Sequence, residues 1–359
     1  MSLYTPVKNK IVEETHSQPI SEVTTNTFVI NLQQAIFNLE DGTYQEKGPN
    51  PGPSEVKKTS SPAKIKHFLT GTELSTEELK QVLEKAKALK QTPSFYSQAL
   101  AHKSLAMIFE KPSFRTRLSF AMAIQSMGGI AIESVSTTRK QETPADMARV
   151  LNGYANFIMV RTHADELLQE MATYATVPVI NGLSALHHPC QILADLLSLW
   201  EQFGSLEGLT VAYIGDGNNI LHSLMLLAPQ LGITIHYCCP ASHQPSASIV
   251  QQAQYIMPDK IYHFSKPEDA VKNAHAVYTD VWTSMGFEEQ KNHEAFQGFQ
   301  VNENLMSYAK PEAVFMHCMP MERGKEVSET LPDSPASIIF TQSENRMHVQ
   351  KALLLFLNR

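Results

Sequence analysis

The chain has 359 residues and a formal net charge of −7, with 43% hydrophobic and 18% charged residues. This length is enough for two domains with separate cores, and the composition is that of an ordinary globular protein. The acidic balance argues against a general nucleic-acid-binding protein, and no apolar run approaches the ~20 residues that a membrane-spanning helix needs.

The cysteines and the first residues of the chain indicate a compartment. The spacing of the cysteines forms neither a CxxC pair nor a disulfide framework; they are Cys190, Cys238, Cys239 and Cys318. The N-terminus lacks the basic and then apolar layout of a signal peptide, and its acidic residues come too early for a transit peptide. We therefore expect a cytoplasmic protein without a membrane segment.

Residues 1–63 differ in composition from the rest of the chain. They contain GPNPGP at 48–53 and SSP at 60–62, which are typical of loops and linkers. One apolar segment, 28–39, predicts a short helix or strand that packs on the main body. We interpret residues 1–63 as a linker-like N-terminal extension outside the catalytic fold.

A regular alternation of helices and strands begins after His67. Ser75 and Glu78 form a capping box at the start of an amphipathic helix, and Pro144 has a favoured first-turn position in another. Short apolar runs predict strands at 105–109, 130–135, 157–161 and 177–180. This alternation predicts a parallel sheet flanked by helices, in a domain of residues 64–204.

A second domain is expected after a long helix at about 188–203, which ends at Gly204. Further apolar runs predict strands at 210–214, 234–238, 260–263, 276–279 and 313–317. The fold class is therefore α/β, with two doubly wound domains, the second of them residues 205–343. A last helix begins at about 344, and we expect residues 344–359 to pack back on the first domain.

The segment FEKPSFRTRLSF, residues 109–120, joins the first strand to a predicted helix at 118–127. Ser113 and Thr116 therefore lie near a helix N-terminus, where free N–H groups and the helix dipole attract anions. Arg115 and Arg117 add planar donors that match phosphate oxygens. Taken alone, the segment is more often a capped helix with solvated arginines, and a phosphate cradle is the alternative.

Polar residues also follow five of the predicted strands, at the carboxyl ends where open α/β sheets bind ligands. Because such loops meet at one rim, they predict a shared cleft. The segments are Arg161-Thr162-His163, residues 181–191 with His187 and His188, residues 215–219, residues 280–286 and Cys318-Met319-Pro320.

Three of these segments have competing interpretations. GDGNN at 215–219 resembles a dinucleotide fingerprint, but Ile220 replaces the third glycine, and the alternative is a turn that presents Asn219 to a small ligand. His187 and His188 have no acidic or thiol partner at zinc spacing, so a single imidazole that donates to a carbonyl oxygen fits better. Cys318 has no base beside it in sequence, which favours a lining role over a nucleophile.

Together, the motifs resemble the aspartate/ornithine transcarbamylase family, and in particular its ornithine branch, from about Lys66 onward. SFRTR at 113–117 is similar to the family's STRTR loop, and HPCQ at 188–191 matches its HPxQ motif. Residues 280–286 resemble its DxxxSMG signature, HCMP at 317–320 resembles HCLP, and ENR at 344–346 resembles a further element.

The resemblance implies carbamoyl transfer from carbamoyl phosphate to the δ-amine of L-ornithine, giving L-citrulline and phosphate in arginine metabolism. It implies no metal ion, no organic cofactor, and a homotrimer or a higher multiple. Carbamoyl phosphate would be bound by Ser113, Phe114, Arg115, Thr116, Arg161, His188, Gln191, Cys318, Met319 and Arg346. The catalytic groups among these would be Arg115, Arg161, His188 and Cys318. Ornithine would be bound by Asn219, Asp280, Ser284 and Met285.

The chain departs from the family pattern at four places. Phe114 replaces Thr in the phosphate loop, and Ile130 replaces a His that reaches a neighbouring subunit. Ala185 replaces an Asp, and residues 321–323 differ from the common versions. These departures leave two alternatives open: a carbamoyltransferase for another amine, such as putrescine or an N-acylornithine, and a non-catalytic ligand-binding paralogue.

Overall fold

The computed structural model describes residues 66–110, 113–135, 142–282 and 293–358, which all belong to one compact unit, Ala63–Arg359. The predicted extension and its apolar segment 28–39 lie outside the described residues. Of the helices in this described part, none combines the length and the apolar character needed to cross a membrane.

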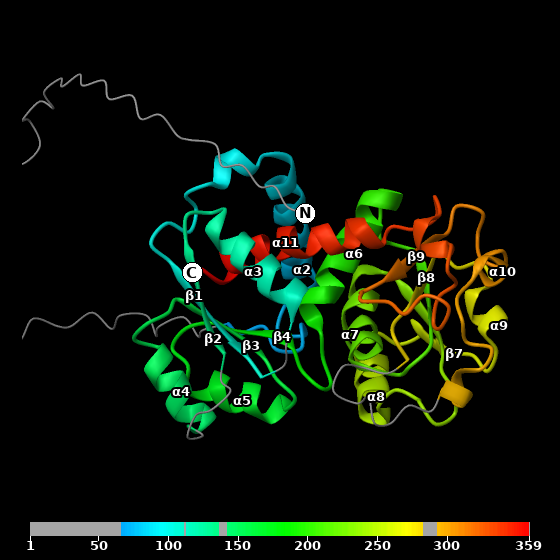
Figure 1. Cartoon of the computed structure of the whole chain (residues 1–359), viewed down its shortest axis with the longest axis horizontal. Coiled ribbons are helices and arrows are strands. Elements are labelled where there is room, and N and C mark those ends of the chain that lie inside the picture. The colour runs from blue at the N-terminus through cyan, green and yellow to red at the C-terminus, as the bar shows by residue number, and fades with distance from the viewer. Residues whose placement is uncertain (1–65, 111–112, 136–141, 283–292, 359) are drawn as a thin grey trace, which may run out of the picture. The chain divides into compact units, whose positions relative to one another are not determined.

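The first sheet has four parallel strands in the order β2-β1-β3-β4 (Figure 1). The strands are β1 (Ser104–Phe109), β2 (Ile130–Val135), β3 (Phe157–Arg161) and β4 (Val179–Leu183). The helices of this half are α2 (Thr76–Gln91), α3 (Phe114–Gln125), α4 (Pro144–Leu151) and α5 (Asp165–Tyr174).

Side chains that alternate along these strands enter different cores, as the two-residue period of a strand requires. Ile108, Ile158 and Val160 pack against α4 and α5. Their neighbours Met107 and Met159 belong to the core that includes α2, α3 and α6. The near-continuous apolar runs in the sequence therefore arise because both faces of the sheet are covered.

The second sheet has five parallel strands in the order β7-β6-β5-β8-β9. They are β5 (Thr210–Ile214), β6 (Thr234–Cys238), β7 (Ile261–His263), β8 (Ala276–Thr279) and β9 (Val314–His317). Its helices are α7 (Asn219–Leu227), α8 (Ala247–Ile256), α9 (Pro267–Val271) and α10 (Glu303–Met306). The predicted α/β class with two parallel sheets is confirmed.

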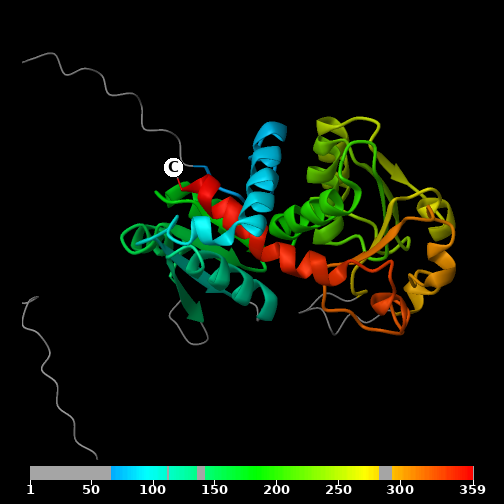
Figure 2. The ribbon, with the colours of Figure 1, turned by 90° about the horizontal axis from the view of Figure 1, so that it is seen from above.

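Two long helices connect the two halves. α6 (Pro189–Phe203) begins after the N-cap His188 and ends at Gly204, whose φ of 75° suits a residue without a Cβ. α11 (Ile339–Leu357) packs against α2, α3 and α6 and also contacts β9, and Figure 2 shows it running along the molecule. One apolar core includes residues of both sheets, α6 and α11.

Three element bounds differ from the sequence prediction by three residues or more. α11 begins at Ile339 rather than at about 344, because its first turns bury the polar Gln342 and Asn345, which do not read as an apolar face. α3 begins at Phe114 rather than at 118, since Ser113 caps the polar turn that precedes the apolar run. β4 continues past 180 through Gly182, where a Cβ would meet Met159 Sδ at 2.5 Å.

Short 3-10 helices complete the described fold, at Pro93–Tyr96, Ala228–Leu231, His293–Phe296 and Leu331–Asp333. The carboxyl ends of β1, β3 and β4 lie at one edge of their sheet, and those of β5, β8 and β9 lie at one edge of the other. Both edges carry the polar segments that the sequence analysis selected.

Candidate active site

Two arginines from distant parts of the chain meet at the hydroxyl of Thr116 in the first turn of α3. Arg161, at the end of β3, donates from Nη1 to Thr116 Oγ1 at 3.3 Å, and Arg346 of α11 donates from Nη2 at 2.9 Å. Thr116 is only 1% exposed. Arg115 lies close enough that its positive charge lowers the pKa of both arginines. We call Arg115, Thr116, Arg161 and Arg346 the arginine cluster.

The arginine cluster is cationic and largely buried. Burial, followed by the like charges of Arg346 and Arg115, lowers the pKa of Arg161 to about 10. Among the described residues, no carboxylate forms an ion pair with these three arginines, and Nε of Arg161 and of Arg346 has no hydrogen-bond partner. Buried charges are costly unless they are paired, so this cluster is suited to a polyanionic ligand.

The start of α3 places its own residues in different directions. Ser113 is the N-cap, and its Oγ accepts from Thr116 N at 3.3 Å, so both residues lie at a helix N-terminus as expected. The Phe114 side chain is 73% exposed, so it does not fill the arginine cluster. Arg117 pairs with Glu133 at 2.6 Å and lies over the Phe109 ring, so it supports the segment from outside the cluster.

His188 and Gln191 lie beside the cluster at the start of α6. Gln191 accepts from Arg346 Nη1 through Oε1 at 2.9 Å. His188 N donates to Ser223 Oγ of α7 at 2.7 Å, while its ring Nδ1 is buried without a described partner. Burial, and then the charges of Arg346 and Arg161, holds the pKa of His188 well below its usual value. A neutral imidazole can donate a hydrogen bond without adding a fourth positive charge.

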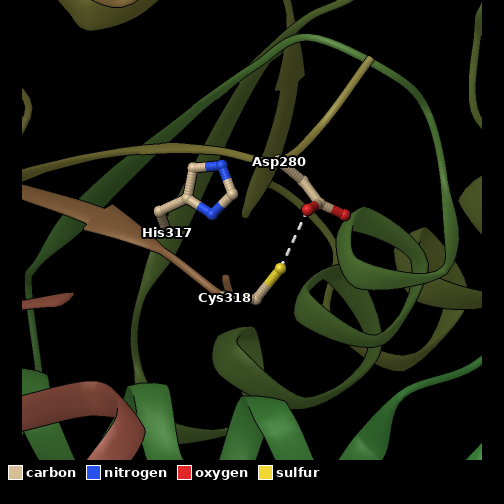
Figure 3. A group of neighbouring side chains, drawn as sticks. All are labelled: Asp280, His317 and Cys318. Atoms are coloured by element: carbon tan, nitrogen blue, oxygen red, sulfur yellow. Dashed lines mark hydrogen bonds between the residues drawn. The ribbon is translucent and has the colours of Figure 1, made fainter. Parts of the chain in front are cut away.

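The carboxylate of Asp280, just after β8, organises the opposite side of the site. Asp280 Oδ1 accepts from the Cys318 thiol at 2.9 Å, as Figure 3 shows, and from Val281 N at 2.8 Å. Asn218 donates to its Oδ2 at 2.8 Å. Burial and then the Asp280 charge raise the pKa of the Cys318 thiol well above its usual value. Cys318 is therefore a protonated thiol, which does not suit a nucleophile.

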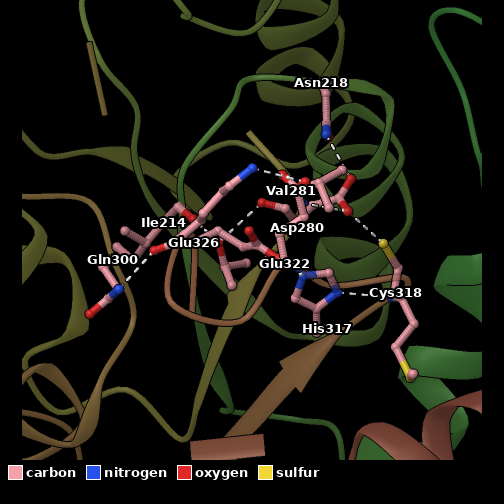
Figure 4. A network of polar contacts seen from close by, with 12 residues as sticks. Ile214, Asn218, Asp280, Val281, Gln300, His317, Cys318, Glu322 and Glu326 are labelled. Carbon is pink, nitrogen blue, oxygen red and sulfur yellow. Dashed lines mark hydrogen bonds and ion pairs between the residues drawn. The ribbon is translucent and has the colours of Figure 1, made fainter. Parts of the chain in front are cut away.

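His317 shapes the segment that carries Cys318. Its Nδ1 accepts from Met319 N at 2.9 Å, and its Nε2 lies 3.2 Å from Glu326 Oε1 (Figure 4). An N–H donor on one ring nitrogen and a carboxylate on the other determine the tautomer, with the proton on Nε2. His317, Cys318 and Asp280 each offer a ligand atom within 4.8 Å of one another, but hydrogen bonds already use these atoms.

A second carboxyl, the partly buried Asp216, lies near Asp280. Burial, and then the charge of Asp280, raises the pKa of Asp216 to about 7. Asp216 precedes the turn that places Asn218 at the N-cap of α7. This side of the site therefore carries negative potential, in contrast to the arginine cluster, and it suits an ammonium group.

Comparison with known proteins finds a matching family domain for each half of the chain. Residues 66–201 match the carbamoyl-P binding domain of aspartate/ornithine carbamoyltransferase, and residues 207–357 match its Asp/Orn binding domain. The chain belongs to the aspartate/ornithine carbamoyltransferase family.

Individual members of the family are similar over nearly their whole length. An ornithine carbamoyltransferase of Anoxybacillus flavithermus is 46% identical over 305 residues, which are 82% of this chain and 97% of the relative. The solved ornithine carbamoyltransferase of Pyrococcus furiosus is 41% identical with a TM-score of 0.76, covering 81% of this chain and 96% of that one. A solved acetylornithine transcarbamylase complexed with acetylcitrulline is 28% identical with a TM-score of 0.74, covering 82% and 99%.

The structure brings most of the expected site residues of this carbamoyltransferase chain together. Hydrogen bonds join Thr116, Arg161, Arg346 and Gln191, and a second set joins Asp280 to Cys318. Cys318 lies within electrostatic range of both Arg115 and Arg161, so the two sets are neighbours. Ser284 and Met285 lie outside the described residues. Their expected contact with ornithine stays a prediction.

Asn219 and Asn218 make different contacts, and the expected contact of Asn219 with ornithine stays a prediction. Asn219 Nδ2 donates to Ser184 O at 2.8 Å, in the segment after β4, whereas Asn218 contacts Asp280. Adjacent residues at a helix start point in different directions, and the GDGNN pattern could not distinguish them. Asn218 is therefore a site residue that the sequence analysis missed, although it lies inside a segment that it selected.

Proposed function

We propose that this chain transfers the carbamoyl group of carbamoyl phosphate to the δ-amine of L-ornithine, giving L-citrulline and phosphate. One observation carries the proposal: buried arginines that pair with no described carboxylate lie near Cys318 and its partner Asp280, at the carboxyl ends of two parallel sheets. The arginines suit the phosphate and Asp280 suits an amino acid's ammonium group. The relatives named ornithine carbamoyltransferase support the same assignment.

The first domain, 64–204, supplies most of the carbamoyl-phosphate site. Arg115, Arg161 and Arg346 neutralise the phosphate, and Thr116 accepts from two of these guanidiniums, which orients them before the ligand binds. Ser113 and the first N–H groups of α3 add donors at a helix N-terminus. Cys318 and Met319 line the site from the other side.

The reaction is an attack of the neutral δ-amine on the carbamoyl carbon. A tetrahedral oxyanion forms, the carbon–oxygen bond to phosphate breaks, and the amine proton leaves with the phosphate. Arg115 and His188 stabilise the oxyanion, while Arg161 and Arg346 stabilise the leaving group. Groups fixed before the reaction supply orientation and electrostatics, and these residues require neither a covalent intermediate nor a bound cofactor.

The second domain, 205–343, binds the acceptor. Asp280 receives the α-ammonium group, with Asn218 and Asn219 beside it, and Ser284 and Met285 are expected to complete this site. The protonated Cys318 lies between Asp280 and the reacting centre, where it orients the carboxylate and lines the path of the amine. We assign Cys318 a positioning and lining role.

The test is product formation by the full-length chain. Purified protein with carbamoyl phosphate and L-ornithine is expected to form citrulline, identified by mass, and one phosphate per citrulline. Reactions without ornithine control for the breakdown of carbamoyl phosphate. Absence of citrulline with both substrates at saturation would contradict the assignment.

A different acceptor is the second candidate. Ala185 and Leu186 are exposed in the segment next to Asn219, where the family commonly has an acidic residue, and this could change the acceptor. The similarity to an acetylornithine transcarbamylase shows that the same fold accommodates an acylated acceptor. Mass analysis with ornithine, N-acetylornithine and putrescine decides between them. We expect ornithine to be preferred over N-acetylornithine, because Asp280, with Asp216 near it, suits a free α-ammonium group, which acylation removes.

The non-catalytic alternative loses its main motivation, since the exposed Phe114 side chain leaves the arginine cluster free. That side chain instead joins an exposed apolar stripe along α3 and the edge strand β2. The stripe consists of Phe114, Leu118, Met122, Ile130 and Ile132. Exposed apolar stripes on an edge strand and its helix favour a protein contact. This supports a homotrimer or a higher multiple, and light scattering of the purified chain measures its mass.

The compartment and the metabolic role are also proposals. All four cysteines are free, which suits a reducing cytoplasm. A role in arginine biosynthesis is supported by a 43% identical relative from Pyrococcus furiosus, which is named an anabolic ornithine carbamoyltransferase. Loss of growth without arginine, after deletion of the gene, would test it.

A further inference from the structure

Asp195 of α6 is a buried carboxylate that the proposed mechanism does not use. It is 0% exposed and accepts hydrogen bonds from three different elements. Its Oδ1 accepts from Gln191 of its own helix and from Gln342 of α11, both at 2.9 Å, and its Oδ2 accepts from Tyr278 of β8 at 2.8 Å. No described cation forms an ion pair with it, so these neutral donors hold the carboxylate in place.

One set of contacts leads from Asp195 into the arginine cluster. Gln191 donates through Nε2 to Asp195, so its Oε1 faces Arg346 Nη1 at 2.9 Å. Since a carboxylate only accepts and a guanidinium only donates, the pair determines which way the Gln191 amide points. Arg346 then donates from Nη2 to Thr116 Oγ1 at 2.9 Å.

The other set leads to the acceptor side. Gln342 also donates through Nε2 to Asp195, and its Oε1 accepts from His317 N at 3.0 Å, next to Cys318. Its amide orientation is determined in the same way. Tyr278, the third donor, lies two residues before Asp280 on β8. Asp195 therefore has a direct contact toward each half of the site.

We propose that Asp195 is a positioning residue that couples the two substrate sites, so that an anion in the arginine cluster raises affinity for the amino acid beside Asp280. The identity of the two ligands rests on the proposed function. A ligand that shifts Arg346 also shifts Gln191, which is hydrogen-bonded to Asp195. A shift of Asp195 then changes the positions of its other two donors, Gln342 and Tyr278. A contiguous chain of contacts is one way to carry such coupling, and by linkage it works equally in both directions.

The chemistry of the residue supports this role over that of a simple link between helices. A carboxylate accepts all three hydrogen bonds at once, whereas an amide of the same shape must present an N–H₂ group to one of the three donors. In Asp195→Asn, therefore, either Gln191 or Gln342 flips its amide or the Tyr278 hydroxyl changes from donor to acceptor, so that one of the three hydrogen bonds is reversed. The helix–helix contact between α6 and α11 has other polar links, including Asn345 to Ser198 at 2.9 Å.

The test measures binding of L-norvaline, which is ornithine without its reactive amine, with and without saturating carbamoyl phosphate. Isothermal titration of the full chain gives both dissociation constants. We expect carbamoyl phosphate to tighten norvaline binding in the wild-type chain at least about fivefold, the lower end of ordinary coupling between sites. In Asp195→Asn the ratio should fall below about twofold.

Two further variants separate coupling from folding. Gln342→Met removes the contacts that Gln342 makes with Asp195 and with His317, so we expect it to lose the coupling ratio while it binds carbamoyl phosphate within about threefold of wild type. Ser198→Ala removes a buried hydrogen bond between the same two helices, outside the Asp195 contacts, and should lower the melting temperature but keep the ratio. If Asp195→Asn does not fold, Gln342→Met and Ser198→Ala decide the question.

Each result has one meaning. A wild-type ratio in Asp195→Asn or Gln342→Met, or a ratio lost equally in Ser198→Ala, would show that Asp195 is only a structural link. A wild-type chain that binds both ligands without coupling also overturns the proposal and leaves the proposed function intact. A chain that binds neither ligand overturns the proposed function, and the coupling with it.

Discussion

The buried charges of the arginine cluster and of the Asp280 side of the site differ in the partners that compensate them. Arg161 and Arg346 share one neutral partner, Thr116, and form no ion pair with a described carboxylate. Asp280 instead receives hydrogen bonds from a thiol, an amide and a backbone N–H group. The cationic half is therefore stabilised by its ligand, whereas the anionic half is already satisfied within the protein.

This difference has a functional consequence. An anion that enters the arginine cluster gains charge pairing and displaces few protein contacts. An ammonium group that approaches Asp280 must share or replace the hydrogen bonds from Cys318 and Asn218. We therefore expect affinity to come mainly from the first half and discrimination between acceptors mainly from the second.

The largest expected effect comes from removing one cation of the cluster. Arg161→Met should lower kcat/KM by about 10²–10³-fold, the range measured when one preorganised donor is removed from a developing charge. The melting temperature should not fall, because a like charge beside Arg346 is removed with it. Steady-state kinetics and calorimetry check both. Arg149→Met, an exposed arginine paired with Asp146, is the matched control. A large loss of stability in Arg161→Met without loss of activity would contradict the view that the ligand, and not the fold, is what needs this charge.

The pH dependence of stability tests the buried carboxyl group of Asp195. Burial raises the pKa of Asp195 from 3.8 to about 6, so the folded chain binds more protons than the unfolded chain between these values. The free energy of unfolding should therefore fall as pH rises from about 4 to about 6, by up to about 3 kcal/mol at 1.36 kcal/mol per pKa unit.

Urea denaturation at several pH values measures this slope. The charged or titratable groups that act on Asp195 are Arg346 from α11, Tyr278 from β8 and Cys318 after β9, and none of them changes charge in this window. Asp216, with a pKa of about 7, adds a slope of the same sign. The difference between wild type and Asp195→Asn isolates the Asp195 part, and equal slopes in both chains would refute it.

A smaller effect is expected from the thiol of the anionic half. Cys318→Ser keeps a donor for Asp280 and should keep kcat within about tenfold of wild type, whereas loss of a nucleophile would abolish turnover. Cys318→Ala, which removes the donor, should lower activity further. Stopped assays of citrulline formation compare the three chains. A Cys318→Ser variant as inactive as one without any donor would argue against a lining role.

The smallest effect is expected at Phe114. Because its side chain is 73% exposed, Phe114→Thr should change the KM for carbamoyl phosphate by less than about threefold. Thr116→Val, a change of similar size in the same turn, removes the hydroxyl that accepts from Arg161 and Arg346, and it should raise KM far more. Equal effects of the two changes would mean that Phe114 does reach the ligand.

Residue patterns within a few positions of one another were enough to predict the elements. The Ser75 capping box, the strands at 130–135 and 157–161, and the Gly204 helix end follow from local rules on caps, alternation and glycine. The start of α11 was wrong by five residues, because its polar face is buried against α6 and only the packed fold covers it. Hydrophobic periodicity predicts a helix from apolar residues on its buried face, so it does not detect a helical turn whose buried face is polar.

By itself, the sequence determined the α/β class, the parallel sheets, the presence of a helix N-terminus near Ser113 and Thr116, and the strand ends that carry the candidate site. These depend on periodicity and on chain direction, which are properties of short segments. Only the tertiary structure decided that Phe114 points outward, that Asn218 rather than Asn219 contacts Asp280, and that Asp195 lies between the two halves. Each of these depends on which residues from distant segments surround a side chain, and no local pattern carries that information.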